Sequence, residues 1–109
     1  MRDFELIYAS ELEKVQKESD ALVVDIRQPM EYERGHWPGA VNYPYTQIER
    51  GGNRLPQNRK LILYCDHGGG SMQLAQMLGR QGFHVASVVG GYEAMKKFSK
   101  TYFKNPRNM

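Results

Sequence analysis

The sequence contains only one cysteine and no long apolar run, and both absences narrow what the protein can be. Cys65 is the only thiol among 109 residues, so no disulfide forms within the chain, and a lone thiol is typical of a reducing compartment. No apolar stretch approaches the roughly 18 residues of a membrane-spanning helix. The charged residues 1–15 lack the apolar core of a signal peptide. We therefore expect a cytoplasmic protein with no membrane partner.

Size and charge indicate an ordinary small globular domain. A chain of 109 residues with 40% hydrophobic and 25% charged residues is long enough to bury one independent core. The net charge is +3, and the segment 96–109 carries five basic residues and no acidic one. Such a tail can bind an anionic partner, but a solvated helix end with a frayed terminus is the simpler interpretation. We expect a monomer or weak dimer with no nucleic-acid partner.

Short apolar runs alternate with helix-like segments along the chain. The predicted strands are 4–8, 22–24, 40–42, 61–64 and 85–89. The predicted helices are 10–18, 29–34, 44–50, 71–81 and 92–98. This alternation favours an α/β fold with a mostly parallel sheet and helices on both faces. In such sheets, ligands bind at the carboxyl ends of the strands.

Local signals predict where the helices begin and which sides they bury. Ser10 is predicted to cap the first helix, with Glu13 completing a capping box. Pro29 suits the first position of the second helix, and Gly35 suits its end. The side chains expected to face the core are Leu12 and Val15 in the first helix and Met72, Leu74, Ala75 and Leu78 in the segment 71–81.

The single cysteine lies where a strand ends and a glycine turn begins. Cys65 follows the apolar run 61–64, and Gly68, Gly69 and Gly70 precede a predicted helix. Consecutive glycines allow successive N–H groups to point into one concavity, which favours an anion. A thiol there would be stabilised as the nucleophilic thiolate. The competing interpretation is a buried structural cysteine beside a flexible turn.

Other kinds of anion or metal site do not fit these residues. A P-loop needs a Gly-Lys-Ser/Thr ending, and a cysteine phosphatase needs an arginine clamp, whereas residues 65–71 contain neither Lys nor Arg. A zinc site using Cys65, His67 and a second histidine matches no common ligand spacing. His36 and His84 are interpreted as structural or surface residues. We expect no metal and no organic cofactor.

Four segments together resemble the single-domain rhodanese-like (sulfurtransferase) family, over about residues 5–100. The first is VVDIRQPMEYERGHWPGAVN, residues 23–42. The second is LILYC, residues 61–65, and the third is the loop 65–71. The fourth is VVGGYEAM, residues 88–95, with its Gly90–Gly91 turn. The family residues in the first segment are Asp25, Arg27, Glu31, Gly35, His36, Pro38, Gly39, Ala40 and Asn42.

This resemblance implies one rhodanese-like domain over residues 1–109, with a five-stranded sheet and a basic tail at 101–109. It implies that Cys65 accepts a sulfane sulfur as a persulfide and passes it to a thiophilic acceptor. Asp25 and Arg27 would fix the loop through an ion pair, and His36 would be hydrogen-bonded within a shaped turn. The implied substrate-binding residues are Asp66, His67, Gly68, Gly69, Gly70 and Ser71.

Two departures from the family pattern bear on the substrate. Many thiosulfate-using members carry an arginine five residues after the cysteine, where this chain has Gly70. Asp66 adds a negative charge that opposes a thiolate and a dianionic donor, and His67 offsets it only in part. We predict a sulfurtransferase whose partners are small sulfur-containing anions, such as thiosulfate, or protein persulfides and thiols. The alternative is a catalytically weak rhodanese-like binding or regulatory module.

Overall fold

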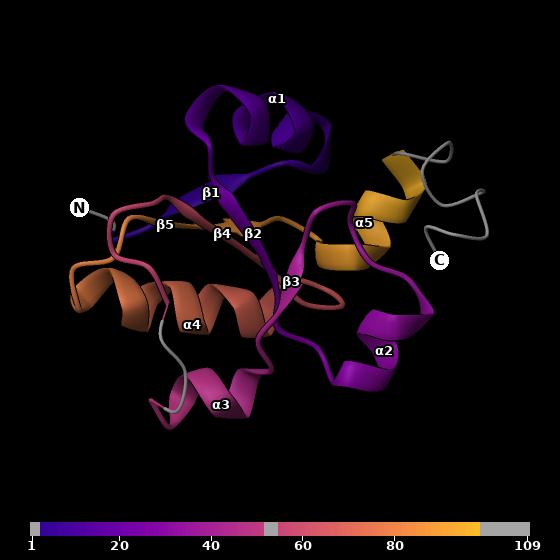
Figure 1. Ribbon diagram of the computed structural model, residues 1–109. Coiled ribbons are helices and arrows are strands. Elements are labelled where there is room, and N and C mark those ends of the chain that lie inside the picture. Colours follow the sequence, from indigo (N-terminus) through magenta and orange to yellow (C-terminus); the bar gives the residue numbers. More distant parts are fainter. Residues whose placement is uncertain (1–2, 52–54, 99–109) are drawn as a thin grey trace.

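The computed structural model describes residues 3–51 and 55–98, in which a central sheet carries helices on both faces (Figure 1). The strands are β1 (Glu5–Ile7), β2 (Leu22–Asp25), β3 (Val41–Asn42), β4 (Leu61–Tyr64) and β5 (Val85–Val88). The helices are α1 (Ala9–Ser19), α2 (Pro29–Arg34), α3 (Tyr45–Glu49), α4 (Gly69–Arg80) and α5 (Gly91–Phe98). The predicted tail at 101–109 lies outside the described residues.

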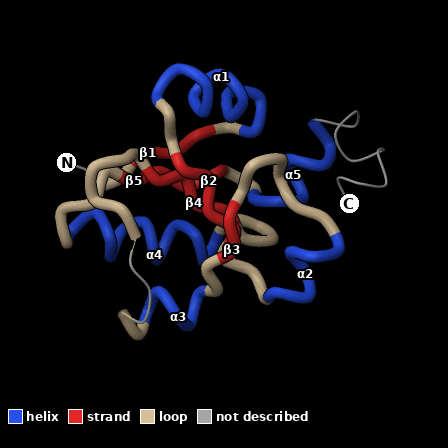
Figure 2. The backbone as a smooth tube through the Cα atoms, in the orientation of Figure 1, coloured by secondary structure: helices blue, strands red, loops and turns tan. Residues whose placement is uncertain are grey.

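The five strands form one parallel sheet in the order β1-β5-β4-β2-β3, seen side by side in Figure 2. The central strands β4 and β5 are buried along their whole length, which requires the nearly continuous apolar sequence that they have. Their carboxyl ends therefore meet at the same edge of the sheet. The α/β fold class, the parallel sheet and the five strands predicted from the sequence are confirmed.

Each face of the sheet has its own apolar core. On one face, α1 and α5 cover a cluster that includes Leu12, Ile62 and Met95, each with its side chain fully buried. On the other face, α3 and α4 cover a cluster that includes Ile48, Leu63 and Leu74, all of them buried. The predicted inward positions in the first helix are confirmed, since Leu12 is buried and Val15 packs against the same cluster. Within the described part of the chain, no helix has both the length and the apolarity needed to cross a bilayer.

The predicted cap of the first helix is wrong by two residues. Tyr8, not Ser10, is the N-cap, and the helix begins at Ala9. The Tyr8 N–H donates a hydrogen bond of 2.9 Å to Glu11 Oε1, so Glu11 fills the place expected for Glu13. Strand β1 ends at Ile7, and the chain enters the helix at once, which leaves Ser10 inside the first turn. The predicted ends of α2, at Pro29 and Gly35, are confirmed.

Helix α4 begins earlier than predicted, and this changes which side chain faces inward. Gly68, with φ +104°, is the N-cap, so the helix starts at Gly69 rather than at Ser71. The prediction that Met72 faces the core is wrong, because its side chain is 43% exposed. The buried positions are Ser71, Leu74, Ala75 and Leu78. Their spacing is the i, i+3, i+4, i+7 stripe of a helix, and a serine occupies its first position.

Candidate functional site

The thiol of Cys65 lies inside the turn that joins β4 to α4, at the carboxyl edge of the sheet. The Gly68 N–H donates to Cys65 Sγ over 3.1 Å, and the Ser71 N–H donates to it over 3.4 Å. Gly68 adopts a left-handed conformation, which a glycine tolerates without strain. Two amides at the start of α4 therefore point at the sulfur, in the arrangement that stabilises negative charge.

The remaining residues of the predicted loop lie at different distances from the sulfur. Gly70 is close, because a Cβ built there would stand 3.9 Å from Cys65 Sγ and 3.6 Å from the Tyr45 ring. Gly69 and His67 are exposed, and a Cβ at Gly69 would meet nothing within 4 Å. The structure thus brings Gly68, Gly70 and Ser71 up to the thiol of Cys65.

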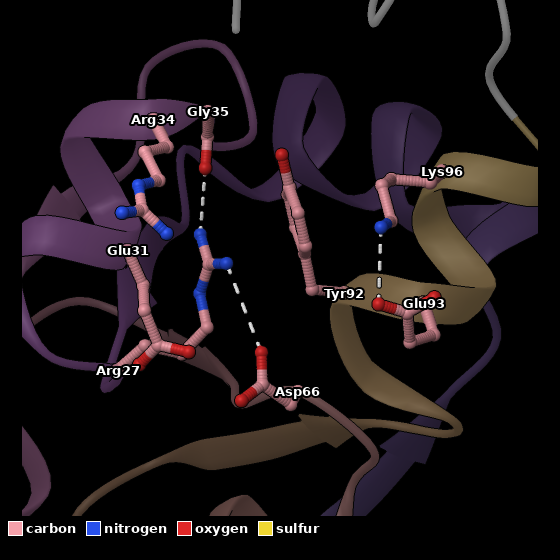
Figure 3. A pocket seen from close by; sticks show the side chains of 8 residues that line it. All are labelled: Arg27, Glu31, Arg34, Gly35, Asp66, Tyr92, Glu93 and Lys96. Atoms are coloured by element: carbon pink, nitrogen blue, oxygen red, sulfur yellow. Dashed lines mark hydrogen bonds and ion pairs between the residues drawn. The ribbon is translucent and has the colours of Figure 1, made fainter.

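The side chain of Asp66 points toward a buried arginine. Its Oδ1 lies 3.8 Å from Arg27 Nη1. Both residues line a cavity of about 390 Å³ (Figure 3). Burial and the neighbouring carboxylate of Glu31 raise the pKa of Asp66, and the positive charge of Arg27 opposes that shift. The negative charge that the sequence placed beside the thiol is therefore partly compensated by Arg27.

This cavity is distinct from the thiol nest, which consists of the Gly68 and Ser71 N–H groups that point at Cys65 Sγ. Its lining combines three cationic and three carboxylate side chains, so it presents no excess of either charge. Cys65 is not among the residues that line it, which are Arg27, Glu31, Arg34, Gly35, Asp66, Tyr92, Glu93 and Lys96.

The ion pair predicted between Asp25 and Arg27 is present and buried. Arg27 Nη2 lies 2.7 Å from Asp25 Oδ2, and Nε lies 3.0 Å from Oδ1, which gives a two-point contact. Nη2 also donates to the Gly35 carbonyl over 2.7 Å, and the guanidinium stands 3.8 Å from the Tyr92 ring centre. Burial by itself would lower the pKa of Arg27, but hydrogen bonds and attraction from Asp25 raise it, so the side chain remains charged.

The GHWPGA segment is a structural turn, as predicted for His36. The His36 Nδ1 lies 2.8 Å from the Tyr32 carbonyl oxygen, and the two rings stack at 3.7 Å. The Trp37 N–H donates to the buried Tyr64 hydroxyl over 3.0 Å. The hydrogen bond from Trp37 connects the segment to Tyr64, the last residue of β4, which directly precedes Cys65.

Two carbonyls of the thiol loop accept hydrogen bonds from the first turn of α5. The Tyr92 N–H donates to the Cys65 carbonyl over 2.7 Å, and the Glu93 N–H donates to the Asp66 carbonyl over 3.1 Å. This close approach needs Gly91, which has φ +59° and whose added Cβ would overlap the Cys65 and Asp66 backbone. The Gly90–Gly91 turn is thus part of the site's support.

Sequence reasoning missed Ser87, which lies under the loop. Its hydroxyl is 2.7 Å from Ser71 Oγ, and both residues are fully buried. Ser71 Oγ is in turn 3.6 Å from Cys65 Sγ. The only available signal was a hydroxyl residue within the otherwise apolar run 85–89. Across residues 3–51 and 55–98, no group of three His, Cys, Asp or Glu side chains is placed to hold a metal ion.

Comparison with known proteins agrees with this geometry. Residues 8–98 match the rhodanese-like domain family. The chain belongs to this family. The resemblance read from the sequence is therefore confirmed, and it covers the thiol loop together with both segments that support it.

Three relatives illustrate the match. YrkF, a candidate sulfur carrier protein of Bacillus subtilis (strain 168), is 34% identical over 80 residues, which is 72% of this chain and 43% of YrkF. The thiosulfate sulfurtransferase GlpE of Coxiella burnetii (strain RSA 331 / Henzerling II) is 30% identical over 86 residues, covering 78% of this chain and 80% of GlpE. The solved structure of the rhodanese homologue TT1651 of Thermus thermophilus is 30% identical, with a TM-score of 0.71 over 84% of this chain and 100% of that one. The chain thus spans less than half of YrkF but most of GlpE.

Proposed function

We propose that the protein is a sulfurtransferase that carries a sulfane sulfur on Cys65 as a persulfide. The observation that carries this proposal is the thiol nest, in which the Gly68 and Ser71 amides point at the only sulfur nucleophile of the chain. Preorganised N–H groups stabilise a thiolate and, later, the charge on an attached sulfur.

The reaction proceeds in two displacements. The Cys65 thiolate attacks the outer sulfur of thiosulfate or of an organic persulfide. The sulfur–sulfur bond of the donor breaks, and sulfite or a thiolate leaves with the electron pair. An acceptor thiolate then attacks the outer sulfur of the Cys65 persulfide, and the Cys65 thiolate leaves with its electron pair. Each step exchanges one bond to sulfur for another, so no external oxidant or reductant is needed.

The donor that suits this loop best is an organic or protein persulfide. A bound thiosulfate dianion needs a counter-charge once it leaves water, and residues 65–71 hold neither Lys nor Arg. Gly70 leaves room beside the thiol, where its hydrogen faces the Tyr45 ring. GlpE is named a thiosulfate sulfurtransferase and YrkF a candidate sulfur carrier, so relatives are associated with both small and carrier-bound sulfur.

Intact mass measurement tests the proposal directly. The purified chain is exposed to thiosulfate or to a low-molecular-weight persulfide and should gain the mass of one sulfur atom, which a thiol reductant removes. Cys65→Ser, which changes a single atom, should fold normally and gain no sulfur. Reversible loading of the Cys65→Ser variant, or no loading of the natural chain by either donor, would refute the proposal.

The alternative is a catalytically weak binding or regulatory module with the same fold. The absence of a loop arginine at Gly70 favours it. Turnover separates the two functions, because a binding module would accept one sulfur without releasing it to a thiol acceptor. Multiple turnovers with an organic persulfide and a thiol acceptor would exclude the alternative.

A further inference from the structure

A pair of buried hydroxyl groups lies directly beneath the Cys65 thiol. Ser71, in the first turn of α4, and Ser87, in β5, are both fully buried, and their oxygens are 2.7 Å apart. Ser71 Oγ also lies 3.2 Å from the Gly68 carbonyl oxygen and 3.6 Å from Cys65 Sγ. The two hydroxyl groups thus form a hydrogen-bonded path from Ser87 in the central strand β5, through Ser71, to Cys65 Sγ.

Counting protons fixes the direction of the Ser71–Ser87 hydrogen bond. Within residues 3–51 and 55–98, Ser71 is the only hydrogen-bond partner of the Ser87 hydroxyl. A buried O–H group without an acceptor is costly, so Ser87 donates its proton to Ser71 Oγ. Ser71 therefore accepts this bond, and its own proton is free to be donated elsewhere.

The Ser71 proton has two acceptors within reach. One is the Gly68 carbonyl oxygen, and the other is Cys65 Sγ when that sulfur is an anion. The Gly68 carbonyl also accepts the Met72 N–H over 3.1 Å, so it keeps a partner when the Ser71 hydroxyl rotates away. In the neutral thiol, the S–H donates to Ser71 Oγ and the Ser71 proton goes to Gly68. In the thiolate, the Ser71 proton turns to the sulfur.

We propose that Ser87 is a positioning residue for the sulfur chemistry. By donating to Ser71 Oγ, Ser87 keeps the Ser71 proton available, and this proton turns to Cys65 Sγ whenever the sulfur is negatively charged. This inference rests on the proposed sulfurtransferase function. The switch acts twice in that reaction, when the Cys65 thiolate attacks and when it leaves. Hydrogen bonds in a chain polarise one another, so the Ser87 donor strengthens the bond from Ser71 to sulfur.

The test is the pH dependence of Cys65 alkylation by iodoacetamide in the full chain. Ser87→Ala should raise the pH of half-maximal alkylation rate by about 0.1 to 0.3 units, since a neighbouring hydrogen bond strengthens a charge-assisted one by roughly 10–30%. Ser71→Ala removes the donor itself and should raise it by about one unit. Ser87→Thr keeps the hydroxyl and should restore the natural midpoint.

Two controls separate positioning from a purely structural role. Val88→Ala makes a cavity in the same buried strand and should lower the melting temperature without moving the midpoint. In a Ser71→Ala background, Ser87→Ala should cause no further shift, because Ser87 acts through Ser71. The substitutions leave the charged and titratable groups around the loop in place, namely Arg27, Glu31, Tyr45, Asp66, His67 and Glu93.

An unchanged midpoint in folded Ser87→Ala overturns the proposal. If that variant fails to fold, an unchanged midpoint in Ser71→Ala overturns it instead. Alkylation reports the thiolate without any sulfur transfer, so this failure is distinct from failure of the proposed function. A shifted midpoint in a protein that forms no persulfide would uphold the switch and refute the sulfurtransferase.

Discussion

Replacing Gly70 by arginine tests whether the missing loop charge limits the use of thiosulfate. Gly70 lies in the first turn of α4, and it is not among the glycines with positive φ in the described residues. A Cβ there would make ordinary contacts, 3.6 Å from the Tyr45 ring and 3.9 Å from Cys65 Sγ. Gly70→Arg therefore places a guanidinium on a side chain that starts beside the sulfur, without forcing the backbone to move.

The expected gain follows from Coulomb attraction. A unit charge pair at about 4 Å and an effective dielectric near 20 is worth roughly 4 kcal/mol before desolvation. If about a quarter of this survives desolvation and side-chain ordering, the net gain is about 1 kcal/mol, which corresponds to a roughly fivefold change in affinity. We expect Gly70→Arg to lower the KM for thiosulfate about fivefold, with little change in kcat. Added salt should reduce the gain.

Two matched variants isolate the charge and its position. Gly70→Gln adds a long uncharged side chain at the same place and should not lower KM. Gly69→Arg adds the same charge at an exposed position, where a Cβ meets nothing within 4 Å, and should have a smaller effect. Circular dichroism and a melting curve confirm folding. A folded Gly70→Arg protein with unchanged KM would show that the reasoning is wrong and that Gly70 instead leaves room for a bulky donor.

Three further predictions concern the support of the site. Arg27→Ala leaves the buried Asp25 carboxylate without its cation and should lower the free energy of unfolding, measured in urea, by about 3–5 kcal/mol. Arg27→Lys should recover only part of this lost stability, because lysine cannot make the two-point contact. Gly91→Ala should reduce kcat for sulfur transfer and the melting temperature, because its Cβ overlaps the carbonyl groups that the α5 amides bind. The hydrogen bond from Lys60 lowers the pKa of Glu5 below its ordinary 4.5, so the stabilisation is present above that pH and is lost as pH falls through the lowered pKa. Melting curves of Glu5→Gln should therefore show a weaker acid dependence below pH 4.5.

The layers of the fold could be predicted because each segment carries its own signal. The central strands of a parallel sheet are buried on both faces, so 61–64 is a continuous apolar run and 85–89 is apolar except for Ser87. Gly68 and Cys65 were found for a related reason, since a glycine turn between a strand and a helix is visible locally. These features depend on neighbours within a few residues, which a sequence displays directly.

Contacts between distant segments could not be predicted in the same way. Ser71 and Ser87 meet because β4 and β5 pair with Leu63 opposite Ser87, and nothing in either strand fixes that register. The misplaced Met72 has the same origin. A helix start at Gly69 puts Ser71 on the buried stripe, but the apolar pattern alone favours the larger methionine. The prediction assumes that apolar residues face the core, so it fails for a buried polar residue such as Ser71.

The start of α5 also sets the direction of backbone amides in the loop 65–71. The sequence alone predicts that these amides lie together, but not which of them contact the sulfur. In a trans peptide, the C=O of one residue and the N–H of the next point in opposite directions. The Cys65 and Asp66 carbonyls are both bound by N–H groups at the start of α5, so the N–H groups of Asp66 and His67 point away from α5. Neither of these two amides donates to Cys65 Sγ, whereas those of Gly68 and Ser71 do. The Gly68 and Ser71 amides thus contact the cysteine sulfur, and the Asp66 and His67 amides do not. This division depends on Gly91, which allows α5 to approach the Cys65 and Asp66 carbonyls and lies 26 residues away from Cys65 along the chain.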